Sequence, residues 1–545
     1  MTFNFSKPLI GLAVSSLLLA GCGATAPVLV STPVENIDTL PLKVSQLSET
    51  EKQTWGHKDL FLDTIPGMAV EKAYTEIIKN KKGDKVIVAV LDSGMDLKHE
   101  DLVNVLWTNT KEIPGNNKDD DNNGYVDDIH GYNFLGESYN EQLEAARVLK
   151  LKLGDAAMQA KAKAKIDADT QKYMGYKSQL DQMYPVVQSA HEAISKHLGK
   201  SDYTKKEVAA IKTEDQTLLQ SQSIIGQMFQ YGDSITEVLE SLKGDITQIT
   251  EMLNYNLNID FDGRKPVGDN PYDITDTKYG NGNPQNRVDT ESHGTHVAGI
   301  IGAQRGNGKG VDGVANNVAL MSIRAVPNGD EYDKDIALGI RYAADNGAKI
   351  INASFGKSFS PNAQWVYDAL KYAASKDVLF VHAAGNDSEN LDDPNNPNFP
   401  NDQVNNGAEF TDNVLTVGSL TSKYGSQMVS SFSNYGTINV DVFAPGSEIY
   451  STVPNSKYEY MGGTSMAAPG VAGIAALIRS QYPKLTAVEV KKIIMQSGIT
   501  TKAKVVVGED SKSTDFDKLS TSGKMANAYN ALILADQVAT GKAKI

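Results

Sequence analysis

The chain has 545 residues, of which 40% are hydrophobic and 22% charged, and its formal net charge is −15 at pH 7. This composition is ordinary for a soluble globular protein that is long enough for more than one domain, and the negative charge excludes nucleic acid as an expected partner, since phosphate binding needs a basic surface. A single cysteine excludes an intramolecular disulfide.

The first 22 residues have the pattern of a signal peptide. Lys7 supplies positive charge, and residues 9–20 form an apolar run that is too short to span a bilayer. The run ends in LAGC at residues 19–22, which resembles the lipobox of bacterial lipoproteins, where the cysteine is lipidated and begins the mature protein. We therefore expect export and a membrane contact through lipid on Cys22 alone, at the cell envelope of a bacterium. The alternative is an ordinary signal peptide with an incidental cysteine.

Two further features bear on the compartment. Gly23, rather than Asp, follows the cysteine, which under the lipoprotein sorting rule favours the outer membrane where a cell has one. Residues 23–52 are rich in Ser, Thr, Pro and Val, which predicts a tether with room for a short pro-segment. We expect one folded domain over residues 53–545.

Five β-branched apolar runs predict strands that are buried on both faces. They are residues 85–91, 318–326, 349–352, 378–383 and 414–417, and helical patterns at residues 335–346 and 363–375 separate several of them. This alternation predicts an α/β fold, a doubly wound and mostly parallel sheet with helices on both faces. Ligands of such sheets bind at the carboxyl ends of the strands.

Residues 138–256 interrupt the alternation, with a single proline, Pro185, and few strand signals. Thr204/Glu207 and Ser234/Glu237 have capping-box spacing at helix starts. Apolar residues spaced three and four apart predict an amphipathic helix over Ile235, Val238, Leu239, Leu242, Ile246, Ile249 and Leu253. We expect an inserted helical hairpin or small bundle packed beside the core, and a membrane-facing or partner-facing surface is the alternative.

Three segments carry candidate catalytic side chains. They are VLDSG with Asp92, SHGTHVAGI with His293, and GGTSMAAP with Ser465. The aspartate leaves a buried strand, and the serine precedes an Ala/Val/Ile helix whose backbone N–H groups can bind a developing oxyanion. Singly, each is modest evidence, because an aspartate after a strand or a serine before a helix is usually a turn or cap residue.

Together, the three blocks closely resemble the Asp, His and Ser signatures of the subtilases, and their order along the chain is that of this family. The resemblance covers roughly residues 85–135 and 285–500. It implies a subtilisin-like fold with a helical insertion, and a serine endopeptidase that acts on proteins or peptides through an acyl-enzyme. No organic cofactor is implied.

The resemblance also assigns chemical roles. The Ser465 hydroxyl is a weak nucleophile that needs a base, and His293 has the ordinary pKa to take its proton and return it to the leaving amine. Asp92 would hold the imidazole in the correct tautomer. Asn386 resembles the oxyanion asparagine of the family and would act beside the backbone N–H of Ser465; the alternative is a turn asparagine.

Subtilases bind an extended substrate along an exposed strand, which corresponds here to Ser354, Phe355 and Gly356, with a second wall that includes Ala384 and Gly385. Phe355, together with Lys357 and Phe359, differs from the small residues often found in that segment. The sequence therefore predicts the place of the substrate but no preferred side chain.

A loop of oxygen-bearing side chains resembles the start of a calcium loop, with Gly124 at its sixth position. Its twelfth position is His130 instead of the glutamate of an EF-hand, so Asp127 or Asp128 must close the site. We expect structural Ca²⁺, and a solvated acidic turn is the alternative. The expected ligands are Asp119, Asp121, Asn123, Tyr125, Asp127 and Asp128.

Asp101 matches a subtilase position that binds a separate calcium, although the loop at residues 305–308 differs from the usual ligand loop. Other departures are the long interval between Asp92 and His293 and a region before Trp55 that is too short for a folded inhibitory pro-domain. Two alternative functions stay open: a surface lipoprotein that uses this fold as a binding scaffold, and a subtilase specialised for transpeptidation or for one precursor.

Overall fold

A computed structural model describes residues 31–34, 37–38, 43, 45–508 and 510–545. The predicted signal peptide and Cys22 lie outside these residues. Among the helices within them, none combines the length and the apolar content that a bilayer span requires.

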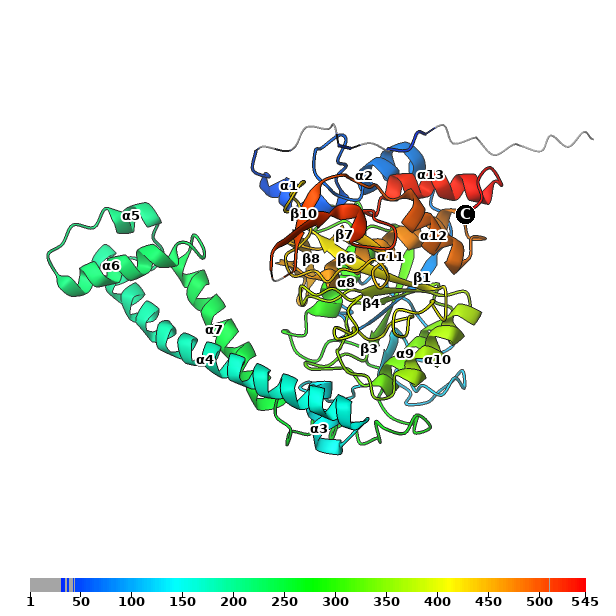
Figure 1. Ribbon diagram of the computed structural model, residues 1–545, viewed down its shortest axis with the longest axis horizontal. Helices are drawn as coiled ribbons and strands as arrows, with labels where there is room; N and C mark the ends of the chain where they lie inside the picture. The colour runs from blue at the N-terminus through cyan, green and yellow to red at the C-terminus, as the bar shows by residue number, and fades with distance from the viewer. Residues whose placement is uncertain (1–30, 35–36, 39–42, 44, 509) are drawn as a thin grey trace, which may run out of the picture.

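A seven-stranded sheet in the order β2-β3-β1-β4-β5-β6-β7 forms the centre of the fold, and every neighbouring pair is parallel (Figure 1). Val88 and Val90 of β1 pack on one face, and Ala89 and Leu91 pack on the other. Because helices cover both faces of the sheet, successive residues of the strand are all apolar, which explains the continuous apolar run in the sequence. The predicted α/β fold is confirmed. The strands are β1 (Val86–Asp92), β2 (Gly131–Asn133), β3 (Val318–Arg324), β4 (Ile350–Ala353), β5 (Leu379–Ala383), β6 (Val414–Leu420) and β7 (Val442–Pro445).

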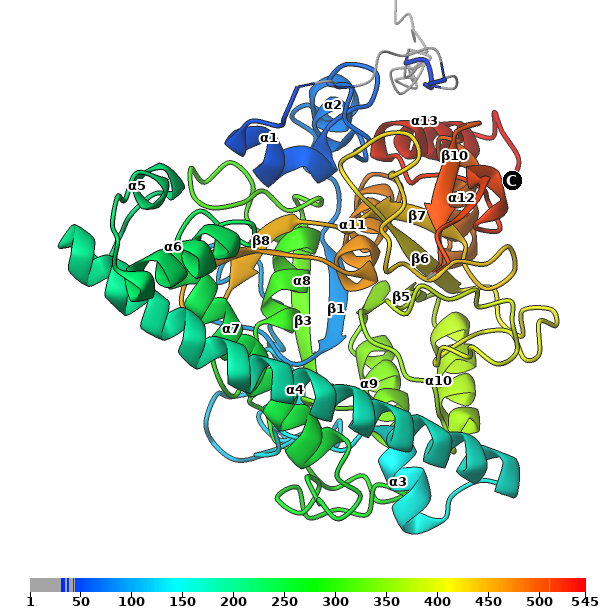
Figure 2. The same ribbon diagram turned by 60° about the vertical axis from the view of Figure 1, so that its left-hand side comes forward.

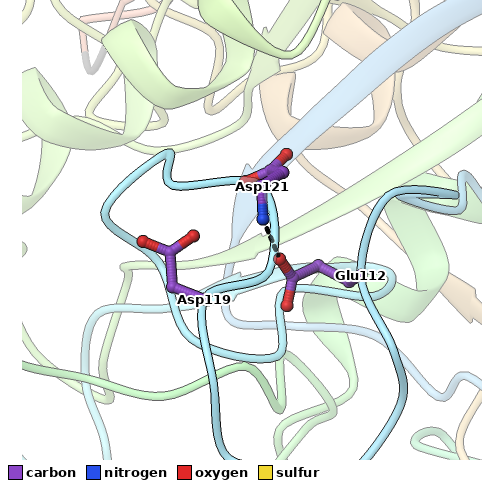
Figure 3. Close-up of side chains that lie close together, drawn as sticks. All are labelled: Glu112, Asp119 and Asp121. Carbon is purple, nitrogen blue, oxygen red and sulfur yellow. Dashed lines mark hydrogen bonds between the residues drawn. The ribbon is translucent and has the colours of Figure 1, made fainter.

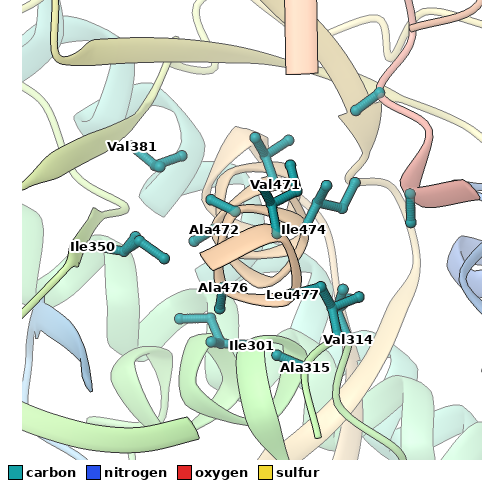
Figure 4. Packing of buried hydrophobic residues seen from close by; sticks show 14 of the residues in the cluster. Ile301, Val314, Ala315, Ile350, Val381, Val471, Ala472, Ile474, Ala476 and Leu477 are labelled. Carbon is teal, nitrogen blue, oxygen red and sulfur yellow. The ribbon is translucent and has the colours of Figure 1, made fainter. Parts of the chain in front are cut away.

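Helices α8 (His293–Gly302) and α11 (Thr464–Gln481) pack on one face of the sheet, and α9 (Asp333–Asp345) and α10 (Ala363–Ser375) pack on the other. Helix α11 lies at the centre of the larger hydrophobic cluster, and its residues 471–478 are all buried. Figure 4 shows its side chains among those of α8, β4 and β5. This packing fixes the first turn of α11 relative to the carboxyl ends of the strands.

Smaller helices from the two ends of the chain lie together at one end of the core (Figure 1). The helices are α1 (Glu49–Thr54), α2 (Val70–Ala73), α12 (Ala487–Ser497) and α13 (Ala528–Ala539), with 3-10 turns at Trp55–His57 and Phe516–Lys518 and a π-helical turn at Tyr74–Ile78. Two antiparallel hairpins pair β8 (Ile449–Val453) with β9 (Lys457–Met461) and β10 (Lys504–Val507) with β11 (Lys512–Asp515).

Part of the predicted tether is bound to the folded domain. The backbone of Val34 donates to and accepts from the side-chain amide of Asn530 in α13, at 2.9 and 2.8 Å. Ile37 is only 1% exposed, and Asp38 accepts a hydrogen bond from Thr501 Oγ1 at 2.7 Å. The chain thus joins the core beside α13, and in Figure 2 the arrow of β1 points away from this end of the molecule.

The insertion is helical, as predicted, but most of it is not packed beside the core. Figures 1 and 2 show α4 and α7 extending away from the sheet as a long arm, with α5 and α6 towards its far end. Its base shares a hydrophobic cluster with Phe359 of the core, and this base consists of α3, the first turns of α4 and the turn that follows α7. The helices are α3 (Glu144–Leu151), α4 (Ala156–Leu198), α5 (Lys205–Ala209), α6 (Gln216–Met228) and α7 (Ile235–Glu251), which continues as a π-helical turn (Met252–Asn256).

The arm has an internal core of its own. Ile235 and Val238, from the predicted stripe, are buried with Val187 and Ile194 of α4. The first part of the stripe, as far as Leu242, therefore packs within the arm, and Leu253 packs in the cluster at its base. Thr204 forms the predicted capping box at the start of α5, whereas Ser234 caps α7 by accepting from a backbone N–H alone.

Candidate active site

The three candidate catalytic residues lie where strands end or helices begin. Asp92 is the last residue of β1, His293 the first of α8, and Ser465 the second of α11. His293 Nδ1–H donates to Asp92 Oδ1 at 2.7 Å, and the N–H of Ser93 donates to the same oxygen at 2.8 Å. The carboxylate, 1% exposed, is thereby aimed at the imidazole, and its hydrogen bond leaves the proton on Nδ1 and Nε2 able to accept another.

The electrostatics of this pair suit a general base. Burial of the ring lowers the pKa of His293, but the negative charge of Asp92 and its hydrogen bond outweigh that effect, so the pKa lies above its ordinary value. The His293 side chain is still 39% exposed. An imidazolium formed when the ring accepts a proton would therefore be stabilised by Asp92.

Ser465 is tied to the end of β4 through Ser354. Its hydroxyl donates to the Ser354 carbonyl at 3.0 Å, and the Ser354 hydroxyl donates to the Ser465 carbonyl at 2.8 Å. That carbonyl is available because Pro469, four residues on, has no N–H to donate to it. The Ser465 hydroxyl thus bonds to the strand rather than to His293 here, and catalytic hydrogen bonds often form only when substrate binds.

Asn386 is held in one orientation by the first residue of α11. Its Oδ1 accepts from the backbone N–H of Thr464 at 2.9 Å and from Thr464 Oγ1 at 3.0 Å, which leaves the Nδ2 hydrogens for a ligand. Gly385 has φ +98°, and a Cβ there would lie 2.5 Å from Asn434 Nδ2, so only glycine fits before the asparagine. The amide is a preorganised donor beside Ser465.

Ser465 and Asn386 line a common cavity of about 370 Å³. Phe355, Gly356 and Gly385, which the sequence placed at the substrate site, also line it. Ser354 and Ala384 lie behind the wall instead: Ser354 holds Ser465, and the carbonyl of Ala384 accepts from two asparagine amides. Sequence analysis missed three lining residues from the insertion, Leu143, Ala145 and Lys165.

A sequence profile of the Subtilase family matches residues 83–523. The chain belongs to this family. Curated relatives of this subtilase include a thermophilic serine proteinase from Bacillus sp. (strain AK1), 38% identical over 269 residues that cover 47% of this chain and 58% of that protein. Thermitase from Thermoactinomyces vulgaris is 40% identical over 199 residues, which cover 36% of this chain and 63% of thermitase. Subtilisin DY from Bacillus licheniformis is 38% identical over 205 residues, which cover 37% and 69%.

The first two of these relatives are therefore matched over less than two thirds of their own length. The family profile begins close to β1 and ends before α13, and it spans the whole insertion. Residues 138–256 of this subtilase accordingly lie between two parts of the family fold.

The acidic loop of the subtilase brings together Asp119, Asp121 and Glu112, each with a carboxylate oxygen within 4.8 Å of the others (Figure 3). Glu112 Oε1 accepts from the backbone N–H of Asp121, whereas Glu112 Oε2 is buried without a hydrogen-bond partner in the described structure. Sequence analysis missed Glu112, which precedes the loop and belongs to no regular pattern. Oxygen ligands converging with a spare carboxylate oxygen suit a hard cation such as Ca²⁺.

The other predicted calcium ligands take part in hydrogen bonds or ring contacts around the same loop. Asp127 accepts hydrogen bonds from backbone N–H groups of residues 115–117. Asp128 accepts from Tyr342 and two asparagine amides, and burial raises its pKa to about 6. Glu112 lies with Asp119 and Asp121, whereas the prediction that Asp127 or Asp128 closes the site stays untested. The Asn123 backbone N–H donates to Asp119 and Asp121, and the Tyr125 ring packs on Tyr132 and Tyr342.

Asp101 is fully buried and already satisfied by neutral donors. Its carboxylate accepts from Asn307 Nδ2 at 2.6 Å, Tyr458 Oη at 2.9 Å and the Val311 N–H at 3.1 Å. The loop at residues 305–311 therefore folds over the aspartate through these hydrogen bonds, and a calcium at Asp101 stays a prediction.

Proposed function

We propose that this subtilase is a serine endopeptidase with Asp92, His293 and Ser465 as its triad and Asn386 as an oxyanion donor. The observation that carries the proposal is the pairing of a buried carboxylate with His293 Nδ1, at 2.7 Å, on the same edge of the sheet as Ser465. A hydroxyl at a helix start, a base oriented by a carboxylate and a fixed amide donor are the parts that acyl transfer requires.

In this mechanism, Ser465 Oγ attacks the scissile carbonyl while His293 Nε2 takes its proton. Asp92 stabilises the imidazolium, and Asn386 Nδ2 with the Ser465 N–H binds the oxyanion. His293 then gives the proton to the leaving amine, which leaves an acyl group on Ser465. Water, deprotonated by His293, attacks this ester and releases the second product, so protons and bonds balance over the cycle.

The direct test is incubation of purified protein with casein and with a labelled serine-directed phosphonate. We expect casein hydrolysis and labelling of Ser465, located by peptide mass mapping. A chain that binds proteins but neither cuts casein nor reacts with the phosphonate would instead support the scaffold alternative.

We also propose that the protein is anchored to the cell envelope by lipid on Cys22. The leader pattern with its single cysteine supports this location. The segment at Val34 is hydrogen-bonded to Asn530 of α13, away from the carboxyl ends of the strands (Figure 2). A lipid anchor on the chain before Val34 would therefore leave the cleft accessible.

We expect Cys22→Ser to release the protein from membranes into the soluble fraction, because the variant lacks the thiol that would carry the lipid. Intact-mass analysis of the native protein should show added diacylglyceryl mass, and the variant should lack it. Thr25→Ala, three residues beyond, should stay membrane-bound and serves as the control. Finding an unmodified Cys22 in the membrane-bound native protein would rule out the lipid anchor.

We further propose that Asp119, Asp121 and Glu112 bind a structural Ca²⁺. Three carboxylates packed this closely repel one another, and a cation removes that repulsion. A ligand bound only to the folded state stabilises it by about 2.7 kcal/mol at a hundred-fold excess over its dissociation constant.

Chelation should therefore lower the melting temperature and increase self-digestion, and Ca²⁺ should reverse both effects better than Mg²⁺, which demands stricter octahedral geometry. Asp119→Ala combined with Asp121→Ala should erase most of the calcium-dependent shift, and Glu112→Gln should reduce it. Glu137→Gln, an exposed carboxylate outside the cluster, is the control. A full calcium shift in the double variant would mean that the loop is an acidic turn.

A further inference from the structure

The segment after β4 is bound to the insertion by a buried ion pair. Lys357 Nζ lies 2.8 Å from Glu144 of α3 and 2.9 Å from Asp333 of α9, and its side chain is 2% exposed. Arg147 of α3 contacts the same Glu144 at 2.6 Å. A lysine, instead of a small residue, stands at position 357 because its side chain joins the segment after β4 to α3.

A hydrophobic contact joins the same two regions. Phe359 is 9% exposed and packs in one cluster with Ala145 of α3 and with Ala162 and Ile166 of α4. Removing a buried aromatic ring from such a cluster is costly, so the first turns of α4 are held firmly over the segment that follows Ser354. The base of the arm and the substrate segment therefore form one packed unit.

The base of the arm also forms part of the cleft wall. Leu143, Ala145 and Lys165 line the same cavity as Ser465 and Asn386. Lys165 lies on α4, the helix that Figure 2 shows crossing in front of the core. A peptide side chain that enters this cavity beside Ser465 consequently meets α4.

The charge on this wall comes from Lys165. Partial burial lowers the pKa of Lys165, but the carboxylates of Asp169, Asp387 and Asp330 outweigh that effect, so the pKa lies above its ordinary value and the amine is charged. Asp387 directly follows Asn386, which places Lys165 near the oxyanion loop. The ammonium thus belongs to the electrostatic environment of the reacting centre.

The ion pair of Lys165 is exchangeable. Its partner is Asp169, one turn along α4 at 3.1 Å, and the Lys165 side chain is 41% exposed. Exposed pairs at this spacing contribute little stability, so a substrate carboxylate can replace Asp169. Lys357, the other lysine on the described lining, is buried between two carboxylates and cannot be released in this way.

Four carboxyls share the lining of this cavity with Lys165: Asp330, Glu331, Asp387 and Glu389. Burial raises the pKa of both Asp330 and Glu331. Asp330 is also engaged by the backbone N–H of Glu144, at 2.7 Å. Among these charges, a substrate carboxylate gains attraction only at Lys165, where it takes the place of Asp169.

We propose that the inserted helix α4 forms one wall of the substrate cleft and that Lys165 is a specificity-determining residue favouring peptides with an acidic side chain facing it. The proposal rests on the peptidase function proposed above and names the class of substrate that its cleft selects.

The test uses the full chain and matched fluorogenic peptides that carry Glu, Gln or Lys at each of the four positions before the scissile bond. We expect the wild type to prefer Glu over Gln in kcat/KM at one position. Lys165→Gln should reduce that preference by roughly three- to tenfold, and Lys165→Glu should shift it towards Lys, as for a charge within a Debye length in a partly solvated cleft. High salt should weaken the wild-type preference.

Lys163→Gln is the matched control, because Lys163 lies on the same helix, pairs with Asp167 at the same spacing and does not line the cavity. It should retain the wild-type preference. An unchanged Glu-to-Gln ratio in Lys165→Gln at all four positions, in an enzyme that cuts the peptides, would overturn the inference while leaving the peptidase function intact.

A second measurement separates the two proposals. Fluorescence anisotropy can measure binding of the same peptides to the Ser465→Ala variant, and this measurement needs no turnover. The Glu peptide should bind more weakly when Lys165→Gln is added to that variant, and Lys163→Gln should have no such effect. If the wild type cuts no peptide, the peptidase function fails and binding alone decides the role of Lys165: equal affinities with and without Lys165→Gln would overturn it.

Discussion

Ser465→Ala should abolish peptide hydrolysis, lowering kcat by on the order of 10⁶-fold, a scale taken from subtilisin, in which the triad acts as a unit. His293→Ala should be about equally damaging, because the hydroxyl is a poor nucleophile without the base that Asp92 orients at 2.7 Å. Hydrolysis of casein and of a fluorogenic peptide by the purified variants is the measurement.

The fold should survive the serine substitution. The Ser465 hydroxyl makes one hydrogen bond, to the Ser354 carbonyl, and loss of a neutral hydrogen bond costs about 0.5–1.5 kcal/mol. Thermal melts by circular dichroism should therefore stay close to wild type. Ser431→Ala, an exposed serine that does not line the cavity, is the control for activity. Wild-type turnover by Ser465→Ala would refute the serine mechanism.

The parts of the molecule that sequence predicted well are those determined by local pattern. The run at β1 is apolar at every position because both sheet faces are covered, and Asp92 follows it directly. His293 and Ser465 stand at helix starts where short motifs place them. Strand β7 was missed because four residues ending in Pro445 carry too little periodic signal.

The parts that sequence did not predict depend on tertiary placement. Periodicity identified the helices of the arm, but no local signal says that α4 begins over Phe359 and turns Lys165 towards the cleft. Glu112 reaches the acidic loop only because the chain folds back on itself there. Lys357 and Phe359 appeared as unexplained departures, and their partners on α3 and α4 are far away in the sequence.

The oxyanion donor can be tested separately from the nucleophile. Asn386→Ala should lower kcat by roughly 10²–10³ with little change in KM, because the amide is preorganised for charge that appears only in the transition state. The amide is preorganised because Asn386 Oδ1 accepts two hydrogen bonds from Thr464, which orient Nδ2 before substrate binds. Steady-state kinetics on a neutral peptide is the measurement.

Two further substitutions test whether Asn386 acts through its amide donor. Asn386→Asp keeps the size and the acceptor at Oδ1 but replaces the donor with an oxygen that repels the oxyanion, so it should be at least as damaging as Asn386→Ala. Thr464→Val removes the Oγ1 hydrogen bond and keeps the backbone one, so its effect should be intermediate. Equal kcat in Asn386→Ala and the wild type would exclude Asn386 as an oxyanion donor. A loss confined to KM would make Asn386 a ground-state binding residue, since only interactions that strengthen in the transition state raise kcat.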